Sequence, residues 1–132
     1  LSDLNYYEAI TASHLGVFPS YYEPWGYTPL ETGALGVASV TTDLAGFGRY
    51  IQKSSMQNNS KTKGIFIIKR ENKSYQELVN SLASVFSKFT AFNKEERIEN
   101  KLQAKKLADM ADWNILSKYY IEAHNLAADR IE

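Results

Sequence analysis

The sequence predicts an α/β fold in which about three parallel strands are flanked by helices and followed by a helical C-terminal end. Short apolar runs alternate with segments of helical periodicity along the chain. That alternation implies a parallel sheet with right-handed crossover connections. Because no repeat, low-complexity segment or linker divides the 132 residues, we expect a single domain over residues 1–132.

Three short segments are the predicted strands, at residues 14–20, 37–42 and 64–69. The first contains the apolar run Leu15-Gly16-Val17-Phe18, as a buried parallel strand should. The second is rich in valine and threonine, which favour strands, and the third carries Ile65-Phe66-Ile67-Ile68. Residues 54–63 are polar and predict an exposed loop.

Helices are predicted at residues 3–12, 28–35 and 49–53, and three more follow the third strand. We expect Asp3 to cap the first helix, Asn93 the fifth and Asp112 the last. Apolar residues at three- and four-residue steps give the fourth and last helices an apolar stripe. The stripes are Tyr75, Leu78, Val79, Leu82, Val85, Phe86 and Phe89, and Trp113, Leu116, Tyr120, Ala123 and Ala127.

The segment from Ser20 to Glu31 joins the first strand to the next helix and reads Ser-Tyr-Tyr-Glu-Pro-Trp-Gly-Tyr-Thr-Pro-Leu-Glu. We expect Thr28 to cap that helix, Pro29 to occupy its first position and Glu31 to complete a capping box. Gly36 then ends the helix. A helix that begins directly after a strand presents free N–H groups and a partial positive charge, which favour an anion such as phosphate.

Two carboxylates, Glu23 and Glu31, frame this turn. Each also has a purely structural interpretation: Glu31 serves its own helix, and Glu23 is a solvated turn residue. Trp25 and Tyr27 are equally compatible with simple packing. The pair alone therefore leaves both interpretations open.

The whole twelve-residue string closely resembles the signature of glycogen synthases of the eukaryotic type, glycosyltransferase family three. The resemblance continues through residues 36–48, Gly-Val-Ala-Ser-Val-Thr-Thr-Asp-Leu-Ala-Gly-Phe-Gly, and returns at residues 107–113, Leu-Ala-Asp-Met-Ala-Asp-Trp. It implies half of a Rossmann-like C-terminal domain of the GT-B architecture, with the ligand off the carboxyl ends of the strands. Since the chain begins at Leu1, we expect a piece of a longer enzyme.

The resemblance implies UDP-glucose as the donor and assigns roles around the nucleotide. Glu31 would accept hydrogen bonds from the ribose hydroxyls, and Thr28 with the following N–H groups would hold the diphosphate. Tyr6 would stack on uracil, although ordinary packing of its helix is an equal alternative and Tyr7 stands beside it. His14 would approach the nucleotide, or else form a hydrogen bond at the start of the strand.

Around the sugar, the resemblance makes Glu23 the catalytic-site glutamate, which orients the glucose and stabilises positive charge at its anomeric carbon. Trp25 and Gly26 would offer backbone N–H groups, and Tyr27 belongs to the same turn. Gly46 and Gly48 match a glycine loop, which unusual backbone angles alone would explain. No metal and no cofactor are implied.

The implied reaction is transfer of glucose from UDP-glucose to the 4-hydroxyl of an α-1,4-glucan such as glycogen, with retention. The family's basic pair and active-site histidine come from segments upstream of Leu1, so we expect the isolated chain to be inactive. One alternative is a stand-alone α/β module that binds a nucleotide or a protein without catalysis. Another is a related GT-B transferase with a different donor or acceptor.

Composition bears on three classes of partner: nucleic acids, metals and membranes. The formal net charge is zero and cysteine is absent, so neither nucleic acid nor a thiolate metal site is indicated. No apolar run approaches the roughly 18 residues of a membrane span, and no leader opens the chain. We therefore expect a soluble, cytoplasmic protein. The first strand, without a neighbour on one side, predicts a homo-oligomer through its open edge.

Overall fold

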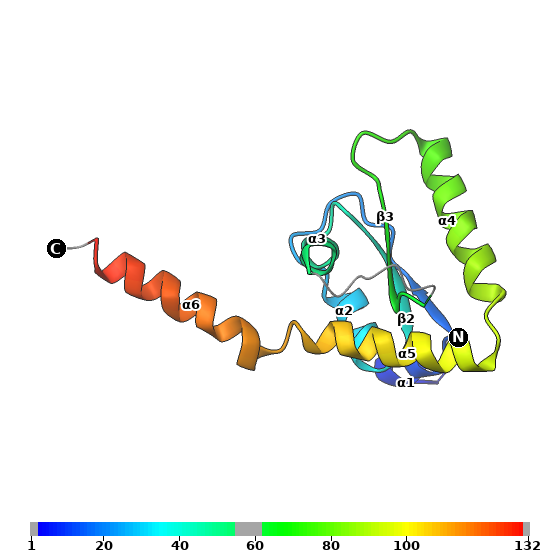
Figure 1. The fold of residues 1–132 in the computed structure, drawn as a ribbon, viewed down its shortest axis with the longest axis horizontal. Coiled ribbons are helices and arrows are strands. Elements are labelled where there is room, and N and C mark those ends of the chain that lie inside the picture. Colours follow the sequence, from blue (N-terminus) through cyan, green and yellow to red (C-terminus); the bar gives the residue numbers. More distant parts are fainter. Residues whose placement is uncertain (1–2, 55–61, 131–132) are drawn as a thin grey trace.

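The computed structural model describes residues 3–54 and 62–130, and it contains the predicted three-stranded parallel sheet (Figure 1). The strands are β1 (Leu15–Val17), β2 (Ala38–Thr42) and β3 (Ile65–Ile68), in the order β1-β2-β3. Leu15 lies opposite Ala38, and Ser39 lies opposite Ile65. The strands are therefore parallel neighbours in the order in which they occur in the chain, and β1 lies at one edge as predicted.

The helices occur in the predicted order along the chain, with the first of them before β1. They are α1 (Tyr6–Thr11), α2 (Tyr27–Ala34), α3 (Gly46–Lys53), α4 (Tyr75–Thr90), α5 (Lys94–Asp109) and α6 (Trp113–Ala128). Most of the predicted loop at residues 54–63 lies outside the described residues. The fold class, an α/β half-domain with a helical C-terminal end, is confirmed.

Two apolar layers hold the helices to the sheet. On one face, Ala38, Val40, Phe66 and Ile68 pack against α4 through Leu78, Leu82, Val85 and Phe89. On the other face, Ile65 packs with Phe47 of α3 and Leu107 of α5, all fully buried. Because helices pack on both faces, we expect a ligand at the ends of the strands.

Several predicted helix boundaries were wrong. Asn5, not Asp3, caps α1, because its side chain accepts the Glu8 N–H while the Glu8 carboxylate accepts the Asn5 N–H. Helix α3 begins at Gly46 rather than near Arg49, so the loop after β2 is shorter than predicted. Asn93 and Asp112 cap α5 and α6 as predicted.

Helix α6 extends away from the sheet (Figure 1). Much of its predicted apolar stripe is consequently exposed, including Trp113 and Tyr120, whose rings pack against each other at 5.0 Å. On α4 the stripe is buried only in part, and Tyr75 and Phe86 remain exposed. Within the described residues, no helix combines the length and apolar character needed to cross a bilayer.

Candidate functional site

The turn between β1 and α2 is fastened to the start of α3. Glu23 forms an isolated parallel bridge with Ala45. The Gly46 N–H donates to the Glu23 carbonyl at 3.0 Å, and the Phe47 N–H donates to the Trp25 carbonyl at 2.7 Å. The backbone that carries Glu23 is therefore positioned by the segment that follows β2, at the carboxyl end of the sheet.

Gly46 and Gly48 permit this close approach. A Cβ atom on Gly46 would overlap the carbonyl oxygen of Pro24, and one on Gly48 would overlap that of Thr42. Neither glycine is among the residues with positive φ, so unusual backbone angles are not the reason for them. Their requirement is steric, because backbone from another segment occupies the space of a side chain.

Helix α2 begins differently from the prediction. Its N-cap is Gly26, with a φ of 107° that disfavours residues carrying a Cβ, and no side chain caps the helix. Thr28 and Pro29 are thus the second and third helical residues, and the predicted capping box of Thr28 with Glu31 is wrong. The N–H groups of Gly26, Tyr27 and Thr28 have no acceptor within the helix, which leaves them available to an anion.

Two adjoining hollows lie beside this helix start. The smaller hollow, of about 260 Å³, is lined by Phe18, Pro19, Ser20, Glu23, Gly26, Thr28, Pro29, Thr41 and Ala45. The larger hollow, of about 300 Å³, is lined by Tyr6, Ala9, Ile10, Ser13, Gly16, Phe18, Thr28, Thr32 and Val37. Phe18 and Thr28 line both, so a ligand that extends past the start of α2 would reach from one hollow to the other.

A hydrogen bond joins two of the predicted site residues across 25 positions of sequence. The Tyr6 hydroxyl donates to Glu31 Oε2 at 2.7 Å, so Glu31 serves α1 and not its own helix. This hydrogen bond, with smaller effects of burial and of the Glu31 charge, raises the pKa of Tyr6 above its ordinary value of 10.0. The bond therefore stabilises the fold below pH 10 and is lost as the pH rises through the raised pKa.

Of the other predicted site residues, Glu23 and Trp25 lie at the turn, whereas Tyr27 and His14 lie outside both hollows. The half-buried Glu23 lines the smaller hollow, and Trp25 packs between Phe47 and Tyr50 at 5.8 and 5.6 Å, which holds the turn. Tyr27 is 69% exposed and His14 is also exposed; neither lines a hollow.

Thr41 and Ala45, which follow β1 by more than twenty residues, were missed by the sequence analysis although both line the smaller hollow. The rule that ligands lie off the carboxyl ends of parallel strands applies to β2 as well as to β1. Applying that rule to the residues at and after the carboxyl end of β2 would have predicted Thr41 and Ala45 as ligand-site residues.

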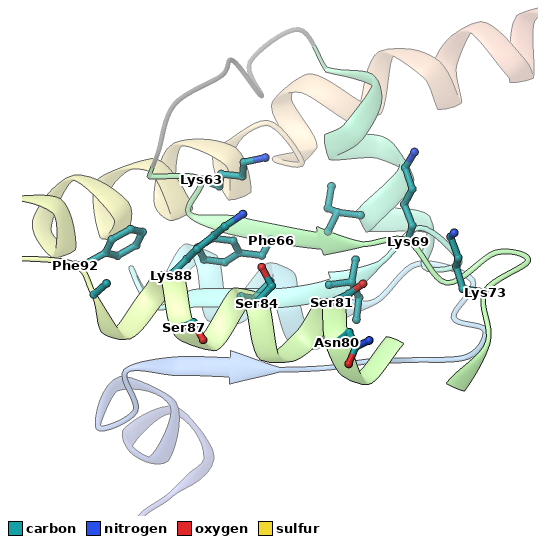
Figure 2. Close-up of a pocket in the computed structure, with 14 residues that line it drawn as sticks. Lys63, Phe66, Lys69, Lys73, Asn80, Ser81, Ser84, Ser87, Lys88 and Phe92 are labelled. Carbon is teal, nitrogen blue, oxygen red and sulfur yellow. The ribbon is translucent and has the colours of Figure 1, made fainter. Parts of the chain in front are cut away.

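A separate, larger cleft of about 1010 Å³ lies between β3 and α4 (Figure 2). Lys63, Lys69, Lys73 and Lys88 stand around it, over a floor that includes Phe66 and Phe92. No sequence motif pointed to this lysine-rimmed cleft. None of its lining residues is acidic, whereas Glu23 lines the smaller hollow beside α2 and Glu31, although it lines neither hollow, is bonded to Tyr6 of the larger one. Carboxylate oxygens are the acceptors that suit the hydroxyl pair of a ribose. The two hollows beside α2 are therefore the better candidate for a sugar nucleotide.

Metal binding is not suggested by the part of the chain that the structure describes. Across residues 3–54 and 62–130, no three histidine, aspartate or glutamate side chains are grouped so that they could hold an ion. The polar groups at the two hollows include the Glu23 carboxylate and the N–H groups at the start of α2, and Tyr6 connects the larger hollow to Glu31.

Comparison with known proteins covers nearly the whole chain. Residues 1–132 match the sequence profile described as glycogen synthase. Glycogen [starch] synthase isoform 2 of Saccharomyces cerevisiae is 40% identical over 127 residues, which are 96% of this chain and 18% of the yeast protein. The Dictyostelium discoideum enzyme is 42% identical over 130 residues, 98% of this chain and 15% of that protein. The human liver enzyme is 38% identical over 130 residues, again 98% of this chain and 18% of its own length.

The chain thus spans less than a fifth of the relatives that it matches. Within that span the match includes both the turn from Ser20 to Glu31 and the loop after β2 that fastens it. On this evidence, the chain belongs to the glycogen synthase family.

Proposed function

We propose that residues 1–132 form a nucleotide-sugar binding domain of a retaining glucosyltransferase, which transfers glucose from UDP-glucose to the 4-hydroxyl of an α-1,4-glucan. The observation that carries this proposal is the pair of adjoining hollows at the uncapped start of α2. One hollow contains Glu23, and the other contains Tyr6, which is bonded to Glu31. A ligand with a sugar at one end and a nucleoside at the other would place its sugar beside Glu23 and its nucleoside beside Tyr6.

The nucleoside would occupy the larger hollow. Tyr6 lines it whereas the neighbouring Tyr7 does not, which favours Tyr6 as the residue that stacks on uracil. Glu31 would accept hydrogen bonds from the two ribose hydroxyls, because a carboxylate offers two acceptor oxygens to two adjacent donors. The ribose would then replace the Tyr6 hydroxyl, which holds Glu31 Oε2 in this structure. His14, one residue beyond Ser13 of the lining, is proposed to approach the nucleotide from the rim.

The diphosphate and the glucose would follow along the start of α2. The N–H groups of Gly26, Tyr27 and Thr28 point along the helix axis with its partial positive charge, which suits the diphosphate. Glu23 would then lie beside the glucose, where its carboxylate orients hydroxyl groups and stabilises positive charge at the anomeric carbon. The backbone hydrogen bonds that hold Glu23 and Trp25 against the start of α3 would give the fixed geometry that such stabilisation needs.

We do not expect this chain alone to catalyse the transfer of glucose. Neither hollow has a lysine, arginine or histidine among its lining residues, so no basic side chain there neutralises the charge of a departing diphosphate. We propose that basic side chains from outside residues 1–132 complete the site, together with the glucan acceptor. Association of copies through the open edge of β1 also belongs to this proposal, because within residues 3–54 and 62–130 β1 pairs with β2 alone.

The proposed function is tested by titrating the chain with UDP-glucose, UDP and UMP in a calorimeter. We expect weak saturable binding of all three, with UMP retaining the contacts of base and ribose. A nucleotide-binding module of another specificity would bind ADP and GDP as tightly as UDP. A protein-binding module would bind none of the nucleotides, and either result would contradict the proposal.

Substitution of Tyr6 separates the role of its ring from that of its hydroxyl. Tyr6→Phe keeps the stacking surface and releases Glu31, so it should bind UDP at least as tightly as the unmodified chain. Tyr6→Ala should weaken binding by about 1–3 kcal/mol, the value of one base stacked on an aromatic ring. Tyr75→Ala is the matched control, because Tyr75 is an exposed tyrosine on α4 that lines neither hollow. Equal losses in the Phe and Ala variants would show that the ring does not stack on the base.

A further inference from the structure

Thr41 is a buried side chain whose polar atom has no hydrogen-bond partner among the described residues. It is 1% exposed, and no partner reaches its Oγ1. Its neighbours on β2 are satisfied: Ser39 donates to the Pro29 carbonyl at 3.3 Å, and Thr42 donates to the Ser20 carbonyl at 2.9 Å. Because buried polar groups are nearly always hydrogen-bonded, this exception requires an explanation.

The position of Thr41 suggests where its partner would come from. Ala38 and Val40 pack in the apolar layer that faces α4, so the alternation of a strand directs Ser39 and Thr41 to the face beneath α2. There Thr41 lines the smaller hollow, together with Glu23 and Gly26. The hydroxyl therefore adjoins the start of α2, where the N–H groups of the first turn also lack acceptors within the helix.

The two groups of unsatisfied atoms point to one ligand. Helix N–H groups can only donate, and they favour the oxygens of an anion. A threonine hydroxyl both donates and accepts, so it suits a neutral hydroxyl or a phosphate oxygen equally well. A hexosyl phosphate offers both kinds of oxygen next to each other. The hollow that contains Thr41 is also the one without Tyr6, the residue proposed for the base.

We infer that Thr41 is a positioning residue for the donor, whose Oγ1 forms a hydrogen bond with the hexosyl phosphate portion of the sugar nucleotide. The inference rests on the proposed function and adds a contact from β2 to those of the turn between β1 and α2. It gives a reason for a hydroxyl at a position where a buried strand would accept valine. Thr41 holds the ligand and takes no part in the bond changes.

The test compares Thr41→Val with Thr41→Ser in the 132-residue chain. Valine has the same shape without the hydroxyl, so removal of an unpartnered buried group should leave the chain as stable as before or more stable. The same variant should bind UDP-glucose about three- to tenfold more weakly, the effect of one lost neutral hydrogen bond, and should bind UMP unchanged. Thr41→Ser should restore the affinity for UDP-glucose. A purely structural role would not change the ratio of the two affinities.

The outcomes separate this inference from the function on which it rests. If the unmodified chain binds UDP-glucose and Thr41→Val binds it equally well, the inference is wrong and the proposed function stands. A loss of stability in Thr41→Val with unchanged binding would mean that a buried water satisfies the hydroxyl. If the unmodified chain binds neither UMP nor UDP-glucose, the proposed function fails and the inference fails with it.

Discussion

Replacing Glu31 with glutamine should reduce the affinity of the chain for UDP by about 10- to 100-fold. The proposed carboxylate accepts two hydrogen bonds from ribose, and hydrogen bonds to a charged group contribute about 1.5–3 kcal/mol each. Glutamine keeps the size of the side chain but offers one acceptor oxygen and no charge. The loss should be the same for UMP, UDP and UDP-glucose, because all three carry the same ribose. Calorimetry with each ligand measures it.

Glu122→Gln is the matched control for this prediction. Glu122 is an exposed carboxylate on α6, which extends away from the sheet, so its replacement changes the net charge equally without affecting the hollows. Thermal unfolding should show that Glu31→Gln remains folded, since the Tyr6 hydroxyl can still donate to the amide oxygen. Unchanged binding by a folded Glu31→Gln chain would contradict the assignment of Glu31 to the ribose.

Gly46→Ala should destabilise the chain strongly and, where folded, impair the sugar end of the site. The new Cβ atom would overlap the carbonyl oxygen of Pro24, which is backbone and cannot rotate away. We expect a loss at or above the upper end of the about 1–3 kcal/mol that overpacking usually costs. The hydrogen bond from the Gly46 N–H to the Glu23 carbonyl would lengthen or break, so Glu23 would be displaced.

Gly36→Ala provides the comparison, because Gly36 has a φ of 74° but open space where a Cβ would lie. Gly36→Ala should therefore lower the free energy of unfolding only by the cost of a left-handed backbone conformation, about 1–2 kcal/mol. Denaturant unfolding should rank Gly46→Ala as the less stable of the two. Among folded chains, Gly46→Ala should lose affinity for UDP-glucose and keep affinity for UMP. The reverse order of stability would show that the contact with Pro24 is not the reason for Gly46.

The fold could be predicted from the sequence because its signals are local. Apolar runs such as Ile65-Phe66-Ile67-Ile68 read as buried strands, and capping residues such as Asn93 and Asp112 mark helix starts. The start of α2 could not be placed in the same way. Thr28 and Glu31 have the spacing of a capping box, but Gly26 reaches a backbone conformation that begins the helix two residues earlier.

The site depended on contacts between distant segments, which the local pattern does not contain. The bond of Tyr6 to Glu31 and the fastening of Glu23 by Gly46 each join separate elements, and both changed an interpretation made from the sequence. Thr41 was overlooked because a threonine in a strand is ordinary; only its missing partner distinguishes it. Burial and hydrogen bonding in three dimensions were needed to recognise these residues.

The central claim, that the start of α2 binds a sugar nucleotide, is tested most directly by NMR of the isotope-labelled chain during a titration with UDP-glucose. We predict that the largest amide shifts occur at residues 23–31, with further shifts at Tyr6 and Thr41, and that UMP moves the amides near Tyr6 and Glu31 but not that of Glu23. Absence of shifts at residues 23–31, or shifts confined to Lys63, Lys69 and Lys88 around the lysine-rimmed cleft, would contradict it.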